Sequence, residues 1–567
     1  MLEPSRPPGA AYWLSVSSDA RQRAPHASVD AEAPTAIALS VVVPVYNLAG
    51  SIAHNVRVIR DRVAAGMDGP IEVIVVSDGS VDRTEEALLE SELDNVRVLH
   101  YDRNFGKGYA VKIGALESQG RWVAYCDADL DLDPASIPEF VAIAERDGLD
   151  FAIGSKRHPD SQVSYPSSRR VASWLFQQLV RILFRLDVRD TQVGLKVFRR
   201  EVADQVVPLL LVKRYAFDIE LLAVARAFGF RRVRELPISL DYQFAGTGVR
   251  PVAVLIALTD TVAIFYRLRI LRTYQRKRAL VGAFGWTRPV GFRSDVTLVG
   301  PDEAALRALE WPNAAVIVAA TPAERREAAE RAGTEFLAFV EDGGAPSGNF
   351  VSATLPFLAR SELAAVVVSK VAPNGGSARE RAAAAIRESR LGGGSQYYRF
   401  LPGNIRYVRD FLGSSYVIRR DRLLALPGNL DPEQVPGALT DRGDRVLYTP
   451  EAFVVASPEP LFAPHLRGAV AHGQARGSAL RRRGVRALRP STALAVVAAA
   501  FVGAGWLLGL GPWLAALVLY AVVVVYRGVA AGAQFRSLSV GGLVCVGLVL
   551  THLAYVSALV TGVVRRR

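Results

Sequence analysis

Residues 122–134 read WVAYCDADLDLDP, an apolar run followed directly by alternating carboxylates. Trp122–Cys126 has the length and composition of a buried strand. Four like charges this close repel one another unless a cation neutralises them, and oxygen ligands suit a hard ion such as Mg²⁺ or Mn²⁺, which can also bridge phosphates. The segment therefore predicts a metal–phosphate site, with a solvated acidic loop or a calcium site as the alternatives.

The chain before this segment alternates strands with helices. Ile37–Val45, Ile71–Val76 and Val96–His100 are short β-branched runs typical of buried strands, with helical spacing between them. Polar residues follow the carboxyl end of the strands. This alternation predicts a mainly parallel α/β sheet, in which ligands bind beyond those carboxyl ends.

A second α/β pattern covers about 293–470. There the expected strand Phe336–Val340 meets Glu341-Asp342-Gly343 much as Trp122–Cys126 meets its acidic loop. This internal similarity suggests a duplicated fold.

Composition narrows the class of protein. The 567-residue chain corresponds to about three or four domains, and half of its residues are hydrophobic, which excludes disorder as the dominant state. Two cysteines, Cys126 and Cys545, cannot build a disulfide framework and fit a reducing compartment. The net charge of +13 suits nucleic acid, an anionic membrane or a phosphorylated substrate.

The position of the charges in the C-terminal region decides among these three explanations of the net charge. Arg467–Arg489 holds seven arginines and no acid, and Pro490–Tyr526 carries no charge. Residues 491–510 and 539–563 are long enough to span a membrane, and 513–526 reaches that length only by continuing past Arg527. Arginine-rich flanks predict a multi-pass protein with cytoplasmic domains and disfavour nucleic-acid binding.

These patterns divide the chain into six parts. The expected bounds are a disordered tail over 1–36, a first α/β domain over 37–278, a linker over 279–292, a second α/β domain over 293–470, a basic juxtamembrane segment over 471–490, and two to four membrane helices over 491–567.

Seven motifs occur in a fixed order along residues 38–272. They are Val41–Asn47 (VVVPVYN), Val75–Asp82 (VVSDGSVD), Asn104–Ala110 (NFGKGYA), Asp127–Pro134 (DADLDLDP), Gly154–Arg157 (GSKR), Asp190–Phe198 (DTQVGLKVF) and Arg214–Leu222 (RYAFDIELL). The set resembles inverting family 2 glycosyltransferases with a GT-A fold. Within that group it is most similar to dolichyl- or polyprenyl-phosphate β-glucosyltransferases and their mannosyl relatives.

The resemblance implies a donor side and an acceptor side. On the donor side, Pro44, Tyr46 and Asn47 would line the nucleotide pocket, Asp78 would bond the base, and Asp127, Asp129 and Asp131 would hold the metal, the last two also acting in catalysis. The cations implied for the donor diphosphate or the acceptor phosphate are Lys107, Lys156, Arg157 and Lys196, joined by Gln192. Asp190 would orient or deprotonate the acceptor. Asp218 and Glu220 are expected either at the site wall or in hydrogen bonds to the core.

The implied activity is inverting transfer of a hexose to polyprenyl phosphate. UDP-glucose is the expected donor, with GDP-mannose as the alternative. A glycolipid or cell-wall glycan acceptor and a non-catalytic membrane scaffold are the competing hypotheses. The second α/β segment resembles a degenerate copy, because Gly343 would replace Asp129 if Glu341 replaced Asp127. Asp441 and Asp444 are catalytic candidates there, with surface acids as the alternative.

Overall fold

The structure is a computed structural model that describes 37–101, 103–161, 167–214, 216–239, 251–283, 294–307, 309, 311, 314–373, 375–403, 405–409, 411–483 and 512–564. The expected N-terminal tail, most of the expected linker and the expected span 491–510 lie outside these residues. The chain divides into two compact units between residues 292 and 293, and each unit is described by itself.

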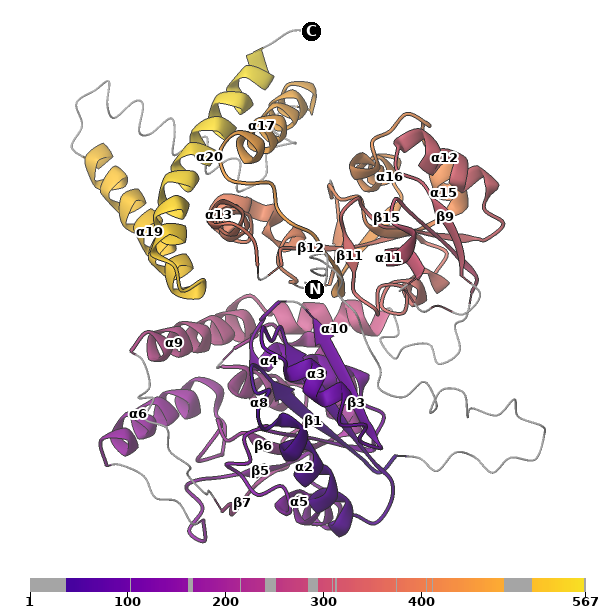
Figure 1. Ribbon diagram of the computed structural model, residues 1–567. Helices are drawn as coiled ribbons and strands as arrows, with labels where there is room; N and C mark the ends of the chain where they lie inside the picture. Colours follow the sequence, from indigo (N-terminus) through magenta and orange to yellow (C-terminus); the bar gives the residue numbers. More distant parts are fainter. Residues whose placement is uncertain are drawn as a thin grey trace, which may run out of the picture. The chain divides into compact units, whose positions relative to one another are not determined.

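The first unit is built on a seven-stranded sheet (Figure 1). Its strands follow the order β3-β2-β1-β4-β6-β5-β7, and only β6 runs against its neighbours. This confirms the predicted mainly parallel sheet. The strands are β1 (Leu39–Val45), β2 (Ile71–Asp78), β3 (Val96–Tyr101), β4 (Trp122–Cys126), β5 (Phe151–Gly154), β6 (Leu195–Arg199) and β7 (Val233–Leu236).

Helices of the first unit cover both faces of this sheet. They are α2 (Ile52–Gly66), α3 (Thr84–Leu89), α4 (Lys107–Glu117), α5 (Ser136–Arg146), α6 (Ser167–Phe184), α7 (Arg200–Gln205), α8 (Phe217–Ala227), α9 (Pro251–Phe265) and α10 (Thr273–Ala283), with a 3₁₀ turn at Val207–Leu209 and a π turn at Tyr266–Ile270. The expected end of the first domain at 278 therefore falls inside α10.

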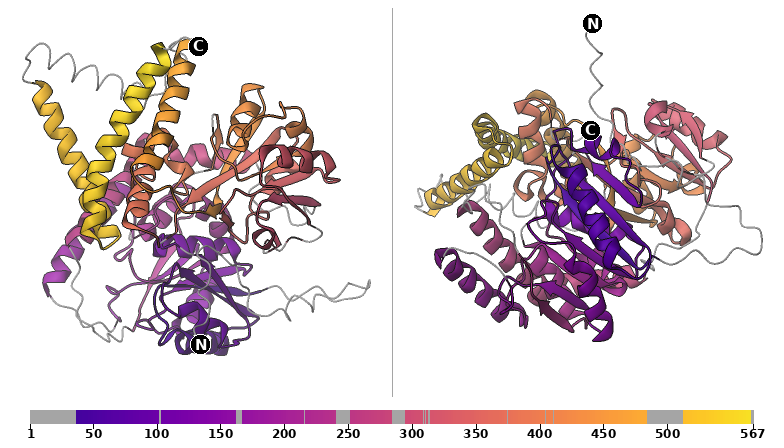
Figure 2. Two further views of the ribbon diagram at one scale, coloured as in Figure 1. Left: turned by 45° about the horizontal axis from the view of Figure 1, so that its top comes forward. Right: turned by 60° about the horizontal axis from the view of Figure 1, so that its bottom comes forward.

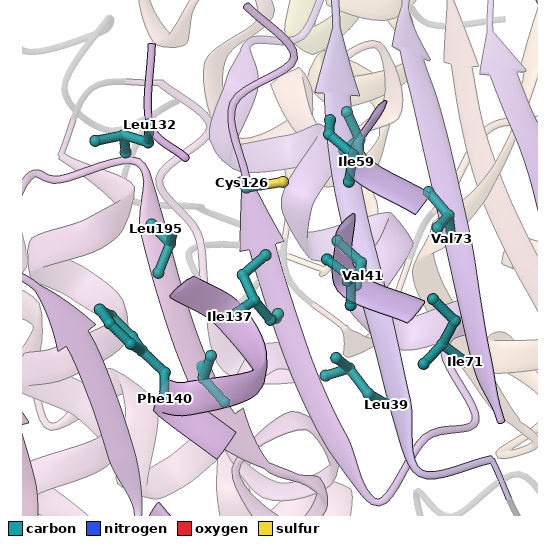
Figure 3. Close-up of a cluster of buried hydrophobic side chains, with 14 of the residues drawn as sticks. Leu39, Val41, Ile59, Ile71, Val73, Cys126, Leu132, Ile137, Phe140 and Leu195 are labelled. Atoms are coloured by element: carbon teal, nitrogen blue, oxygen red, sulfur yellow. The ribbon is translucent and has the colours of Figure 1, made fainter. Parts of the chain in front are cut away.

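Alternation along the central strands decides which helix covers which face. Val41 joins a buried cluster with Ile59 of α2 and with Ile137 and Phe140 of α5 (Figure 3). On the opposite face α4 approaches β1 so closely that a Cβ at Gly114 would overlap a methyl group of Val42. Because successive strand residues point to opposite faces, one apolar run supplies both cores.

The second unit contains another sheet with the same plan. Its strands are β8 (Val296–Gly300), β9 (Ala315–Val318), β10 (Phe336–Phe339), β11 (Ala345–Pro346), β12 (Leu363–Val371), β13 (Arg406–Val408), β14 (Tyr416–Arg419) and β15 (Arg445–Val455). The order β9-β8-β10-β14-β12-β15 repeats β2-β1-β4-β6-β5-β7 in sequence order and in every strand direction. Among the described residues, β3 has no counterpart there.

Short helices connect the strands of the second sheet. They are α11 (Glu303–Arg307), α12 (Pro322–Arg331), α13 (Ala378–Arg387), α14 (Arg390–Gly393), α15 (Arg420–Leu424) and α16 (Val435–Asp441), with 3₁₀ turns at Leu355–Ala359, Gly394–Arg399 and Pro432–Gln434. Ser377 and Glu380 start α13 with a reciprocal capping box. A buried cluster that includes Leu337, Val367 and Ile418 forms the core of this sheet.

Three long helices complete the second unit: α17 (Ala463–Arg483), α19 (Pro512–Gln534) and α20 (Leu538–Val564). Helix α17 runs through the expected domain boundary at 470 and lies beside α20 (Figures 1 and 2). Ala516–Gln534 and Leu538–Val564 are long and apolar enough to cross a membrane. The segment expected over 513–526 therefore does continue past Arg527 to a spanning length.

Candidate active site

The site begins where β4 ends. Cys126 pairs with Leu195 of β6, so the next residue, Asp127, reaches the backbone of Gly194, and any side chain at 194 would overlap its carboxylate. Lys107, the first residue of α4, forms an ion pair with Asp127. Strand pairing and a glycine thus hold Asp127 beside a cation.

Electrostatics at this edge favour an additional cation. Burial opposes the charge on Lys107, but Asp127, Asp218 and Asp129 outweigh it and raise its pKa. The pKa of Asp129 is raised because desolvation and the neighbouring Asp127 charge disfavour its ionised form. A positive ion near Asp127 and Asp129 would relieve that repulsion.

The acidic loop is positioned by its own backbone and by α2. Asn55 donates through Nδ2 to the Ala128 carbonyl at 2.8 Å, and the amide of Asp131 donates to Asp129 Oδ1 at 3.2 Å. Leu130 between these acids adopts a positive φ of 61°. The loop therefore makes a sharp, internally bonded turn that keeps Asp129 exposed at its apex.

Oxygen donors at 127, 129 and 131 fit a divalent ion that is shared with a ligand. Asp133 instead forms an ion pair with Arg62 at 2.9 Å. Within the described residues, no three His, Cys, Asp or Glu side chains are gathered into a complete metal site. Mg²⁺ commonly binds one or two carboxylates and completes its coordination with substrate phosphates and water. The role of Asp131 as a further ligand stays a prediction.

The predicted nucleotide-pocket residues stand at the end of β1. Pro44 is half-buried and Tyr46 is 45% exposed. Asn47 has a positive φ of 53°, donates its amide to Ser80 Oγ at 3.1 Å, and accepts from the Val81 amide at 2.8 Å through Oδ1. Asn47 therefore joins the loops that follow β1 and β2. Contact of these residues with a nucleotide stays a prediction.

Asp78 at the end of β2 holds the chain that leads into α4. Its Oδ1 accepts from the Tyr101 hydroxyl and the Phe105 amide, both at 2.8 Å, and its Oδ2 accepts from the Gly106 amide at 2.7 Å. Burial raises its pKa to about 6, although these hydrogen bonds act in the opposite direction. Asp78 thereby positions Lys107; its predicted bond to a base stays a prediction.

The predicted acceptor side lies on the loop before β6. Asp190 accepts from the Lys156 amide through Oδ2 and from the Gln192 amide through Oδ1, both at 3.2 Å. Arg157 is half-buried in the same turn as Lys156. The structure thus brings these four residues together, and the same loop continues to Gly194.

Glu235 is a positioning residue that the motifs do not include. Its Oε1 accepts from the amides of Arg189 at 2.9 Å and of Asp190 at 2.8 Å. It lies in β7, which pairs with β5. No local pattern indicates Glu235, because its bonding partners are more than forty residues away in the sequence.

Lys196 is buried beneath the site. Its Nζ donates to the Val193 carbonyl and to Asp218 Oδ1, both at 2.6 Å, and the Tyr125 hydroxyl bonds the same oxygen. Burial lowers its pKa, although Asp218 opposes that effect. In this arrangement Lys196 neutralises Asp218; its contact with a phosphate stays a prediction.

Glu220 belongs to the core, one of the two roles expected for it. It has no exposed surface, and its Oε2 accepts from the amides of Leu211 and Val212 at 2.8 Å each. Its other oxygen bonds the Tyr274 hydroxyl. Glu220 therefore ties α8 to the preceding loop and to α10.

Among the candidates of the second unit, Asp444 is paired with Arg422 at 3.0 Å. The Asp444 side chain is only 12% exposed, so it is not the surface acid of the alternative, and its catalytic role stays a prediction. Glu341 lies at the end of β10, as expected, and its surroundings are described below. Whether this unit is a degenerate glycosyltransferase stays a prediction.

Residues 40–207 match the model of "Glycosyl transferase family 2". The first domain belongs to this family. Its match covers the sheet edge with Asp127, Asp129 and Asp190, and it confirms the resemblance drawn from the ordered motifs. The family 2 domain is followed by a region that this model does not match.

Curated relatives match about one third of this chain. Glycosyltransferase AglD of Haloferax volcanii is 34% identical, with 36% of this chain and 33% of that protein covered. Dolichyl-phosphate beta-glucosyltransferases of Dictyostelium discoideum and Homo sapiens are 32% and 33% identical, with 34% of this chain and 62% and 63% of those proteins covered. The chain therefore spans between one third and two thirds of the length of these relatives.

Among solved structures, glucosyl-3-phosphoglycerate synthase from Mycobacterium tuberculosis, in complex with Mn²⁺, UDP and phosphoglyceric acid, is similar to part of this chain. Its sequence is 22% identical, the match covers 41% of this chain and 78% of that chain, and the TM-score is 0.31.

Proposed function

We propose that the family 2 domain is the catalytic part of a membrane-bound enzyme that transfers glucose from UDP-glucose to polyprenyl phosphate. The observation that carries the proposal is the arrangement of Lys107, Asp127 and Asp129 at the carboxyl end of β4. The names of the curated relatives support a lipid phosphate as acceptor and glucose as the sugar.

The donor is proposed to bind with its diphosphate at this edge. Asp127 and Asp129 would hold Mg²⁺ or Mn²⁺, with Asp131 as a further ligand. When bound, the ion supplies positive charge that stabilises the departing diphosphate. Lys107 adds a protein cation at the same place, and Asp78 keeps it there by holding the amides of residues 105 and 106.

The acceptor needs little help from a base. A phosphate monoester has a second pKa near ~6, so most of it is already a dianion at neutral pH. Its oxygen forms the new bond to the anomeric carbon while the bond to UDP breaks, and UDP leaves with the electron pair. Attack from the side opposite to the leaving group inverts the configuration. Asp190 is therefore proposed to orient Lys156 and Gln192 through their amides rather than to remove a proton.

Membrane attachment is proposed to come from the C-terminal helices. Ala516–Gln534 and Leu538–Val564 have the length and apolar character of spans. Arg536 lies in the turn between them, which favours the cytoplasm for that side under the positive-inside rule, whereas Arg527 lies inside the first of these helices. A catalytic domain on the same side would meet both a soluble donor and a lipid acceptor.

The test uses the full chain in detergent with UDP-[¹⁴C]glucose, Mn²⁺ or Mg²⁺, and a polyprenyl phosphate. We expect label in the organic extract, released by mild acid as free glucose. GDP-mannose in parallel distinguishes the two donors, and a glycolipid acceptor tests the competing hypothesis. If no combination of donor and metal labels lipid, the proposal is wrong.

A further inference from the structure

The second sheet has a region that corresponds to the candidate active site of the first sheet, at the carboxyl end of β4. β10 occupies the place of β4 in the shared strand order, with β8 in the place of β1 and β14 in the place of β6. The residues just after β10 therefore stand where the family 2 domain gathers Asp127 and Asp129. Their chemistry differs, because Gly343 stands two residues after Glu341 where Asp129 stands two residues after Asp127, and basic side chains from other elements surround Glu341.

Glu341, the acid nearest to the end of β10, is neutralised by the protein itself. Its Oε2 accepts from Lys370 Nζ at 2.8 Å and from Ser414 Oγ at 3.1 Å, and its amide donates to Ser415 Oγ at 3.1 Å. The Lys370 side chain is 38% exposed, whereas that of Glu341 is 10% exposed. An ammonium group thus sits on the carboxylate and still faces solvent.

A second cation approaches the same edge from α12. Arg325 is only 6% exposed, and its Nη2 donates to the Val340 carbonyl at 3.0 Å. Within the described part of the chain, its Nε and Nη1 have no hydrogen-bond partner. Burial lowers its pKa, although Tyr416, Glu341 and Asp342 oppose that effect. A buried guanidinium with two unpartnered donors is costly unless a ligand or water accepts from them.

A third cation, Arg399, ends the 3₁₀ turn Gly394–Arg399. Ser369 Oγ donates to the Tyr398 carbonyl at 3.1 Å, which holds this end of the turn beside the strand segment that carries Lys370. Burial lowers its pKa to about 10, with Glu433 and Glu341 among the charges that oppose the effect. Its guanidinium lies over the rings of Phe400 and Phe411, at 5.2 and 5.8 Å from their centroids. These rings hold the group in place without neutralising it.

We propose that this edge of the second sheet binds a diphosphate group without a metal ion, on Lys370, Arg325 and Arg399. Three acids, Glu341, Asp342 and Glu433, lie near these cations. Among the described residues only Lys370 of the three forms an ion pair, with Glu341, so the guanidinium groups of Arg325 and Arg399 keep charge for an anion. Guanidinium donors also match phosphate oxygens in geometry. Each sheet carries a lysine on its first acid, Lys107 on Asp127 and Lys370 on Glu341, but the second adds the guanidinium groups of Arg325 and Arg399 where the first is proposed to use a metal ion.

Inorganic pyrophosphate is the probe, titrated by calorimetry into the full chain in detergent with EDTA present. Binding that survives EDTA is expected, and Lys370→Gln and Arg399→Gln should each weaken it threefold or more. Glu341→Gln should strengthen it, since a competing negative charge is removed and Lys370 is released. UDP and a short-chain prenyl diphosphate, added as competitors, distinguish a nucleotide from a lipid source of the group.

Two controls separate this site from the family 2 domain. Arg360→Gln changes another arginine of the second unit, one paired with Glu362 at 3.4 Å, and should leave the affinity unchanged. The double variant Asp127→Asn/Asp129→Asn should also retain binding in EDTA. The proposal is overturned if EDTA abolishes all binding by folded protein, if both cation variants bind within threefold of the wild type, or if Glu341→Gln weakens binding as they do.

Discussion

The carboxylate of Asp127 rests on the backbone of Gly194, with no room for a Cβ atom between them. This contact joins the residue that follows β4 to the loop that carries Asp190. The contact at this one glycine therefore fixes the position of the proposed metal-binding side relative to the proposed acceptor side. Its role is steric, since the distance between the two backbones sets where the Asp127 oxygens lie.

Replacing Gly194 with Ala should displace Asp127 and lower transfer activity. A misplacement of about 1 Å in an active site can reduce the rate about 100-fold, and we expect a loss of that order. The measurement is glucosyl transfer at saturating metal. Gly437→Ala is the control, because a Cβ at 437 meets nothing within 4 Å. Wild-type activity in folded Gly194→Ala would contradict the proposed role of this contact.

Asp129 and Asp133 lie four residues apart in the acidic loop and should behave differently. Asp129→Asn should lower transfer by about 100-fold or more, as when one charge-stabilising group is removed from an active site. Asp133→Asn loses only an exposed ion pair with Arg62, worth at most about 1 kcal/mol, and should retain activity. A chelator should abolish transfer by the wild type, with recovery on addition of Mn²⁺ or Mg²⁺. Equal losses in both variants would argue against a metal site centred on Asp127 and Asp129.

Lys196 and Asp218 should show strong coupling in a double-mutant cycle. Lys196→Met leaves the buried carboxylate with fewer partners and should destabilise the first domain by about 3–5 kcal/mol, whereas adding Asp218→Asn should recover much of that loss. Hydrogen exchange of the β4 and β6 amides reports these changes within one domain. Transfer activity provides the second readout. If Lys196 binds phosphate, activity stays low in the double variant even where stability returns.

Asp78 should make the stability of the first domain depend on pH. Its folded pKa is about 6, above the ordinary value of 3.8, so the folded state keeps this proton longer than the unfolded chain. Unfolding therefore releases a proton between about pH 4 and 6, and stability falls as pH rises through that window, by up to about 3 kcal/mol.

Asp78→Asn removes this titration. The difference in stability between wild type and variant should change between pH 4 and 6 and be flat above that range. The variant also presents an amide to a site filled by donors from Tyr101, Phe105 and Gly106, so we expect a residual loss of about 1–3 kcal/mol at pH 4. Exchange rates of the β2 and β3 amides measure both effects. A constant difference across pH 4–6 would show that Asp78 keeps an ordinary pKa.

Local patterns in the sequence were sufficient for the sheet and for the acidic loop. The strand expected over Trp122–Cys126 has those bounds in the structure, because the charged residues Arg121 and Asp127 limit the apolar run on both sides. The order of the motifs was also sufficient to identify the family of the first domain. Both inferences rest on residues that are adjacent or ordered along the chain, and the sequence shows this directly.

Tertiary structure decided which polar residues face outward and which serve the core. Lys196 and Lys107 both occur in motifs, yet Lys196 is buried against Asp218 while Lys107 reaches Asp127 at the sheet edge. In the second sheet, Lys370 lies 29 residues beyond the acid that it neutralises. Sequence spacing cannot reveal such pairs, because strand pairing and helix packing bring them together, and burial then determines whether a charge serves stability or remains available to a ligand.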